Sequence, residues 1–208
     1  MKNVWLPALA ALLFGVLFSQ QGLGPLDFWS GLSGSILFLC GLAWLSDRSY
    51  APRLYSDLSS GIVSKLCWGI GSAVLLYLVF ACGNILLRLI FPLQAGGNIQ
   101  AVYALKDGAS LLRVTLLLAL VIGPGEELFW RGAIQHRLSV SCGSLWGFLL
   151  AATIYAGVHI ASGNPLLVMA AAVCGIYWGL LYWWKRSLLI NCVSHTLWDL
   201  TVFLVLPF

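Results

Sequence analysis

Long apolar segments follow one another along this chain of 208 residues. A helix needs about 20 consecutive apolar residues to cross the hydrocarbon core of a bilayer, where each backbone polar group must be satisfied within the segment. These segments predict an all-α, polytopic membrane helix bundle with about seven transmembrane helices. The expected spans are 4–19, 28–46, 62–91, 110–138, 145–160, 165–184 and 188–206.

Two stretches between the expected spans are more polar. Residues 47–57 contain a proline and two arginines, and residues 94–107 are rich in glycine and polar residues, so both are expected to be loops. The fourth span is interrupted by Gly123-Pro124-Gly125. Proline removes a helical hydrogen bond and tends to kink a helix, so this span is expected to be kinked.

The composition agrees with a membrane protein, since 61% of the residues are hydrophobic and 9% are charged. The eleven Lys and Arg residues are spread along the chain and form no basic tract, so nucleic-acid binding is not expected. The lipid bilayer is the expected partner. The small size and the lack of long loops favour the plasma membrane of a prokaryote.

The distribution of basic residues predicts the orientation, because cytoplasmic loops carry an excess of Lys and Arg. With the N-terminus in the cytoplasm, seven basic residues fall on the cytoplasmic side and three on the other. The seven are Lys2, Arg48, Arg53, Lys65, Arg137, Lys185 and Arg186, and the three are Arg88, Lys106 and Arg113. We therefore expect a cytoplasmic N-terminus.

The only two glutamates of the chain, Glu126 and Glu127, lie in the fourth span. A charged side chain near the bilayer centre costs roughly 2.5 to 3.5 kcal/mol on insertion scales, so such residues usually have a function. Arg131 lies four residues after Glu127, on the same face of a helix. We expect these two to form an ion pair with a structural or substrate-orienting role. Glu126 points elsewhere and is free to take a proton from water.

The spacing of four residues recurs in two later spans. Tyr155 and His159 are so spaced in the fifth span, and His195 and Asp199 in the seventh. Three helices thus each offer a polar face, and we expect these faces to meet in one hydrated pocket.

These residues resemble the CPBP family of intramembrane proteases, which includes the type II CAAX prenyl endopeptidases and bacteriocin-processing or immunity relatives. The family pattern is EExxxR, then FxxxH, then HxxxN or HxxxD. The first motif matches from Glu126 to Arg131, the second from Tyr155 to His159, and the third from His195 to Asp199. The resemblance covers about residues 111–203. It suggests N-terminal helices over 1–108 and a catalytic bundle over 109–208, within one integral membrane unit.

The resemblance implies an endopeptidase that cleaves a membrane-associated or lipid-anchored protein or peptide. The catalytic residues would be Glu126, His159, His195 and Asp199. Glu126 and His159 would activate water, while His195 and residue 199 would polarise the scissile carbonyl. Tyr155 replaces the usual phenylalanine, which we expect to matter little. Asp199 stands where asparagine is frequent, and it is expected either to act directly or to hold His195 as a charged donor.

Two alternatives stay open. Glu126, His159, His195 and Asp199 are of types that bind zinc, although no HExxH motif is present; we expect no metal or other cofactor. A non-enzymatic membrane protein, such as an immunity factor, a scaffold or a proton relay, could use the same buried polar residues.

Overall fold

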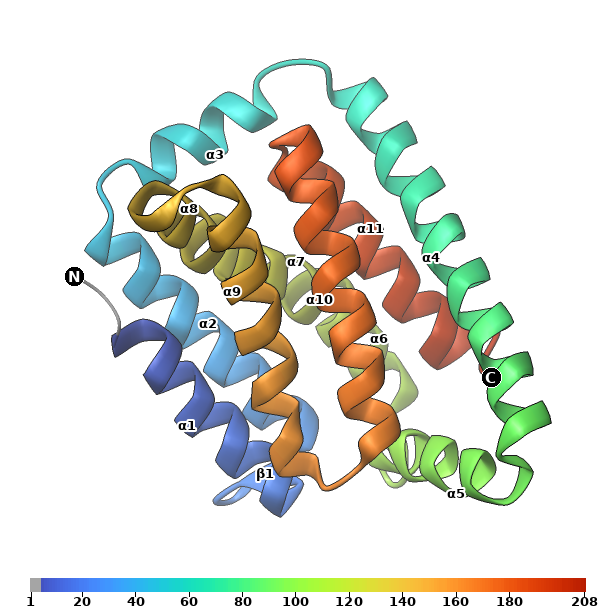
Figure 1. Ribbon diagram of the computed structural model, residues 1–208. Helices are drawn as coiled ribbons and strands as arrows, with labels where there is room; N and C mark the ends of the chain where they lie inside the picture. Colours follow the sequence, from blue (N-terminus) through green and yellow to red (C-terminus); the bar gives the residue numbers. More distant parts are fainter. Residues whose placement is uncertain (1–4) are drawn as a thin grey trace.

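The computed structural model describes residues 5–208, except for the side chains of residues 92–95, and is a bundle of helices (Figure 1). A short hairpin of β1 (Gly22–Leu23) and antiparallel β2 (Leu26–Asp27) joins the first two helices. Lys2 and Val4, used in the predictions of orientation and of the first span, lie outside the described residues. The predicted all-α membrane bundle is confirmed.

Within residues 5–208, five helical segments are long and apolar enough to cross a membrane. They are α2 (Phe28–Ser46), α4 (Ile62–Ile90), α9 (Ser144–Val158) with η4 (His159–Ser162), α10 (Pro165–Lys185), and α11 (Leu188–Leu200) with η5 (Thr201–Val205). A sixth is counted if Gly96–Lys106 and Leu111–Cys142, bent by 96°, form one span. The apolar helix α1 (Trp5–Gln20) has only 16 residues, so the count of seven stays a prediction.

The span that carries both glutamates is one helical stretch with changing hydrogen-bond patterns. It consists of α6 (Leu111–Leu117), the π-helical segment η2 (Leu118–Ile122), α7 (Gly123–Glu127), the π-helical segment η3 (Leu128–Gln135) and α8 (His136–Cys142). Pro124 lies in the first turn of α7, where its missing N–H is tolerated. We expected a kink near this proline. The structure has π-helical segments on both sides of α7, a feature that is frequent at functional sites.

Both stretches expected to be loops contain helices, so these two predictions were wrong. Residues 50–58 form α3 (Tyr50–Leu58), and residues 92–106 form α5 (Pro92–Tyr103) followed by η1 (Ala104–Lys106). The physical reason is the same in each case: Pro52 and Pro92 lie within the first turn of their helices, where proline costs no hydrogen bond and its fixed φ suits the helix. In both stretches, proline therefore lies at the start of a helix and does not interrupt one.

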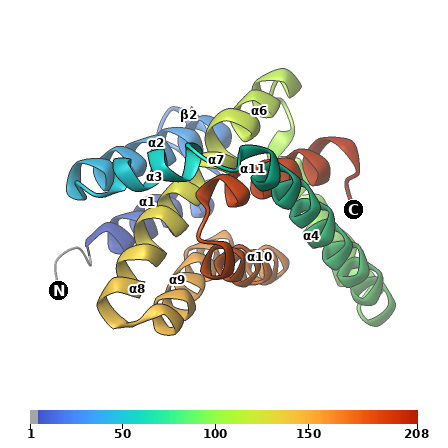
Figure 2. The ribbon, with the colours of Figure 1, turned by 90° about the horizontal axis from the view of Figure 1, so that it is seen from above.

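The helices run between two ends of the bundle, which we call the α3 end and the α5 end (Figure 1). At the α3 end, the turn after α8 meets the turn after α10, since Arg186 Nη2 donates to Ser144 Oγ at 2.8 Å. At the α5 end, Asn164 Nδ2 at the start of α10 donates to the carbonyl of Asn98 in α5 at 2.9 Å. Seen along the bundle in Figure 2, α4 lies at its side, where it packs mainly on α11.

Candidate active site

Glu127 is completely buried and accepts hydrogen bonds from three side chains. Its Oε1 accepts hydrogen bonds from Arg131 Nη1 and His195 Nδ1, both at 2.8 Å, and its Oε2 accepts one from Asn191 Nδ2 at 2.9 Å. The expected ion pair between Glu127 and Arg131 is present. The hydrogen bond from His195 was not expected. Through this bond Glu127, the second glutamate of the first motif, holds the ring of a histidine from another helix.

Arg131 is held on its far side as well. Its Nη2 donates to the carbonyls of Cys174 and Gly175 in α10 at 3.4 and 3.3 Å, and its guanidinium lies over the ring of Tyr155 at 4.8 Å. Only 2% of Arg131 is exposed. A buried charge needs such bonds, because an ion left unpaired in the interior would cost several kcal/mol. Arg131 therefore ties the Glu127 carboxylate to α10 and to the second motif.

Glu126 has different surroundings from its neighbour. Its Oε2 accepts a hydrogen bond from the hydroxyl of Tyr155 at 2.8 Å, and among the described residues no other side-chain hydrogen bond to Glu126 is found. The second oxygen of Glu126 is thus free to bond a water or a substrate. A phenylalanine, which the family pattern has in place of Tyr155, would lack this donor, so the replacement that we expected to matter little makes direct contact with Glu126.

His159 lies where α9 passes into η4. Its Nδ1 is 2.8 Å from the carbonyl oxygen of Tyr155. Because a carbonyl only accepts, Nδ1 must carry the proton, and Nε2 of the neutral ring is then an acceptor. Phe18 of α1 packs against this ring with 4.7 Å between ring centroids. The first helix, which carries none of the motifs, therefore helps to hold His159.

His195 is fixed by three groups. Its Nδ1 donates to Glu127, its ring stacks on the indole of Trp178 at 3.7 Å between centroids and 17° between planes, and its Nε2 lies 3.5 Å from Asp199 Oδ2. The indole is itself oriented, because Trp178 Nε1 donates to Ser194 Oγ at 3.1 Å. The expected contact between His195 and Asp199 is present at 3.5 Å, whereas the hydrogen bond between His195 and Glu127 is shorter, at 2.8 Å.

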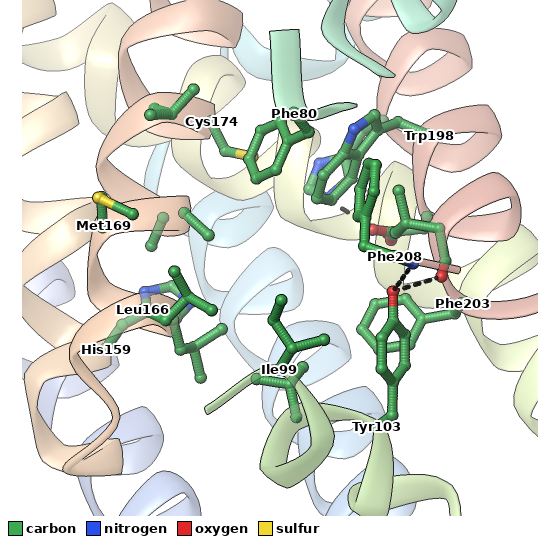
Figure 3. Close-up of a pocket in the computed structure, with 18 of the residues that line it drawn as sticks. Phe80, Ile99, Tyr103, His159, Leu166, Met169, Cys174, Trp198, Phe203 and Phe208 are labelled. Atoms are coloured by element: carbon green, nitrogen blue, oxygen red, sulfur yellow. Dashed lines mark hydrogen bonds and ion pairs between the residues drawn. The ribbon is translucent and has the colours of Figure 1, made fainter. Parts of the chain in front are cut away.

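The three motifs meet at one cavity of about 500 Å³. Its polar lining includes Glu126, Tyr155, His159, His195 and Asp199, and the remainder is mostly apolar. Figure 3 shows His159 on one side of this space and Tyr103, Phe203 and Phe208 on the other. Glu127 and Arg131 lie outside the residues that line it. The two adjacent glutamates are therefore separated into one that faces the cavity and one that does not.

The geometry does not assemble a metal site from these side chains. Within the part of the chain that the structure describes, no three His, Cys, Asp or Glu side chains are grouped so that they could hold a metal ion. The nitrogens His159 Nδ1 and His195 Nδ1 already bond to protein oxygens.

Sequence reasoning missed several residues of the site. Asn191 lies four residues before His195, so the stripe Asn191, His195 and Asp199 could have been found from its spacing. No spacing pattern in the sequence distinguishes Trp178 and Phe18, because apolar spans contain many aromatic residues and most of them only pack in the core. Their roles follow only from the packing of α1 and α10.

A comparison of the sequence with models of protein families gives evidence that does not depend on the geometry of the site. Residues 108–201 match the family model of the Rce1-like type II CAAX prenyl endopeptidases. This part of the chain, a little less than half of its length, is similar to that family. The match includes all three motifs of the endopeptidase and none of the residues of α1 to α5, which confirms the resemblance to the CPBP proteases. It supports a membrane endopeptidase activity in general terms. Neither a curated protein nor a solved structure matches the chain significantly.

Proposed function

We propose that the chain is an intramembrane endopeptidase in which Glu126 is the general base that activates water. The observation that supports this most directly is the different placement of the two glutamates. Glu126 lines the cavity beside His159, His195 and Asp199 with one oxygen free, whereas both oxygens of Glu127 are bonded to protein side chains. A general base needs an acceptor atom within reach of the proton it removes, and of the two glutamates only Glu126 offers one.

In the proposed first step, water bonds the free oxygen of Glu126 and Nε2 of His159. Glu126 takes one proton as the water oxygen attacks the carbonyl carbon of the scissile bond. The resulting tetrahedral intermediate breaks its C–N bond when the same proton passes from Glu126 to the leaving amine. Tyr155 holds the other oxygen of Glu126 throughout, which keeps the carboxylate aimed at the water.

The negative charge on the carbonyl oxygen needs a donor. We assign this role to Nε2 of His195, since Glu127 holds the opposite nitrogen and Trp178 fixes the plane of the ring. An ionised Asp199 would repel the developing oxyanion if it faced it directly. Its distance of 3.5 Å from Nε2 suits the second role expected for it, in which it favours the charged, donating form of His195.

The proposal uses no metal, and a zinc-dependent reaction is the mechanistic alternative. Activity of the purified enzyme should withstand prolonged treatment with a zinc chelator, and added zinc should not raise it. Loss of activity with the chelator and its recovery with zinc would instead assign Glu126, His159, His195 or Asp199 as ligands.

The decisive variant is Glu126→Gln, which keeps the shape of the side chain and removes its basicity. General base catalysis contributes typically about 10²- to 10⁴-fold, so membrane precursors cut in wild-type cells should persist uncut in Glu126→Gln cells. Mass spectrometry of the membrane proteome measures this. Asp107→Asn, the same carboxylate-to-amide change at an exposed position at the α5 end, is the matched control. Full biological activity of Glu126→Gln would favour the non-enzymatic alternative.

A further inference from the structure

The ring of His195 needs more than one contact to keep a single orientation. The hydrogen bond from Nδ1 to Glu127 leaves the ring free to swing about the line of that bond. The stack on the indole of Trp178, with 3.7 Å between centroids and 17° between planes, removes this freedom. An oxyanion donor works only within about 2.7 to 3.1 Å of the developing charge. The plane of the indole therefore determines where Nε2 of His195 can act.

The indole of Trp178 is completely buried, and its N–H has one partner. Nε1 donates to Ser194 Oγ at 3.1 Å, and Ser194 is completely buried as well. The indole ring has no other polar atom, so this hydrogen bond is the polar contact that fixes its rotation. The orientation of the Ser194 hydroxyl thus decides how firmly the indole is held.

The hydroxyl of Ser194 is connected to α4. Ser72 Oγ lies 3.0 Å from Ser194 Oγ and 3.0 Å from Tyr177 OH, and Tyr177 OH lies 2.8 Å from the carbonyl oxygen of Ser72. Helix α4 comes this close because Gly69, one turn before Ser72, has no side chain that would meet Val193. Three helices therefore share one buried group of hydroxyls.

The directions of these hydrogen bonds follow from the number of protons. A carbonyl only accepts and a hydroxyl has one proton to donate, so Tyr177 donates to the carbonyl of Ser72. Ser72 is then the donor at its contact with Tyr177 and the acceptor at its contact with Ser194. Each donor of this hydrogen-bond chain is used once, from the indole N–H of Trp178 to the backbone carbonyl of Ser72.

We infer that Ser72 of α4 is a positioning residue of the active site. It holds the hydroxyl of Ser194 so that its oxygen accepts the indole N–H of Trp178, and the indole sets the plane of the His195 ring. This role rests on the proposed peptidase function, in which His195 stabilises the oxyanion. It gives α4, which lies outside the family match and carries no motif, a part in catalysis.

Histidine NMR in detergent tests whether Ser72 holds the ring. The chain has three histidines, so isotope-labelled histidine gives few ring signals, and His195→Gln identifies those of His195. The stacked indole should shift these signals upfield. In Ser72→Ala they should move downfield, because the indole is no longer held over the ring, while the other two histidines keep their signals and show that the variant is folded. His195 signals that stay in their wild-type position overturn the inference.

Tyr77→Phe is the matched control for a hydroxyl that only joins helices, as polar side chains often do in membranes. Tyr77 of α4 donates to the carbonyl of Leu206 at 3.3 Å, and this bond is not connected to Trp178. The His195 signals should not move in this variant. A movement as large as in Ser72→Ala would show that any lost hydroxyl of α4 disturbs the ring, and would overturn the inference.

A double variant tests whether the two serines act in one chain. Ser194→Ala removes the acceptor of the indole N–H directly, so it should reproduce the movement seen in Ser72→Ala. The combination of both changes should move the His195 signals no further than Ser194→Ala alone, because residues of one hydrogen-bond network are not additive. Additive movements would contradict the chain.

Cleavage kinetics test the link to catalysis, with a precursor that accumulates uncut in Glu126→Gln cells as the substrate. A misplacement of about 1 Å can cost about 10²-fold, so kcat should fall about tenfold in Ser72→Ala. KM should change little, because Ser72 does not line the cavity. An unchanged kcat with a displaced His195 ring would overturn the positioning role and leave the peptidase standing. If no cut depends on Glu126, the peptidase function fails and the role in catalysis with it, while the NMR signals still show whether Ser72 holds the ring.

Discussion

Neighbouring carboxylates in one helix can have opposite tasks, because residues 126 and 127 point about 100° apart around the helix axis. Glu127 points into the protein and meets Arg131, His195 and Asn191. Glu126 points to the cavity and meets Tyr155. Substitutions at Glu127 should therefore lower the stability of the protein, and substitutions at Glu126 should lower its activity.

Glu127→Gln should destabilise the protein. The amide leaves Arg131 buried without its counter-charge, and breaking a buried ion pair from one side costs about 3 to 5 kcal/mol. Thermal unfolding in detergent measures the loss, with Glu126→Gln as the control that should melt close to the wild type. Equal melting of both variants would contradict a structural role for the pair of Glu127 and Arg131.

Tyr155→Phe should keep the fold and weaken the reaction. The variant restores the residue of the family pattern but removes a hydrogen bond to the charged form of Glu126, and such bonds contribute about 1.5 to 3 kcal/mol. We expect kcat to fall about tenfold or more, because the carboxylate that takes the proton from water loses the donor that holds it in place. An unchanged kcat would show that the hydroxyl of Tyr155 does not act on Glu126.

At the scale of elements, α11 depends on α4. An added Cβ at Gly69 of α4 would lie 2.6 Å from Cγ1 of Val193, between Asn191 and His195 on α11, and 3.1 Å from the carbonyl oxygen of Ile190. This contact is close because small residues let membrane helices approach each other. The position of the catalytic stripe on α11 is therefore set partly by a helix outside the family match.

Gly69→Ala should push α4 away from α11. Overpacking at such a contact costs typically about 1 to 3 kcal/mol, and the melting temperature and the activity should fall together. Gly71→Ala is the matched control on the same helix, since nothing lies within 4 Å of a Cβ built there; alanine in a helix is even favoured over glycine by roughly 0.5 to 1 kcal/mol. Equal effects of the two variants would contradict the packing explanation.

At the scale of the whole molecule, the two parts proposed from the sequence, 1–108 and 109–208, depend on each other. Phe18 of α1 packs against His159, and Ser72 Oγ of α4 is 3.0 Å from both Tyr177 OH of α10 and Ser194 Oγ of α11. Asp57, in the last turn of α3, accepts a hydrogen bond from the backbone N–H of Leu189 at 2.8 Å and so fixes the start of α11. We propose that the chain folds as one unit.

Residues 109–208 expressed alone should therefore be inactive and poorly folded. Co-expression with 1–108 as a separate fragment should restore activity, because the break falls beside the exposed turn at Asp107 and Gly108. Size-exclusion chromatography in detergent and the cleavage assay measure the two effects. An active isolated fragment 109–208 would show that the N-terminal helices only flank the enzyme.

The spans and the motifs could be predicted from the sequence because their signals are local. The expected segment 28–46 coincides with α2, and 165–184 differs from α10 by one residue at its end. The pair Glu127 and Arg131 followed from the helical period. The helices α3 and α5 were missed because proline can both begin and break a helix, and composition alone does not distinguish the two cases.

The sequence by itself determined that this chain is a helical membrane protein with three polar faces, since apolar length and a spacing of four residues are properties of single helices. Only the tertiary structure decided which partners those faces have. It brought His195 into a hydrogen bond with Glu127, and Tyr155 into a hydrogen bond with Glu126. It also placed the cavity in the half of the bundle nearer α5. The physical reason is that these contacts join residues on different helices, and the way helices pack is fixed by the shapes of all of them together.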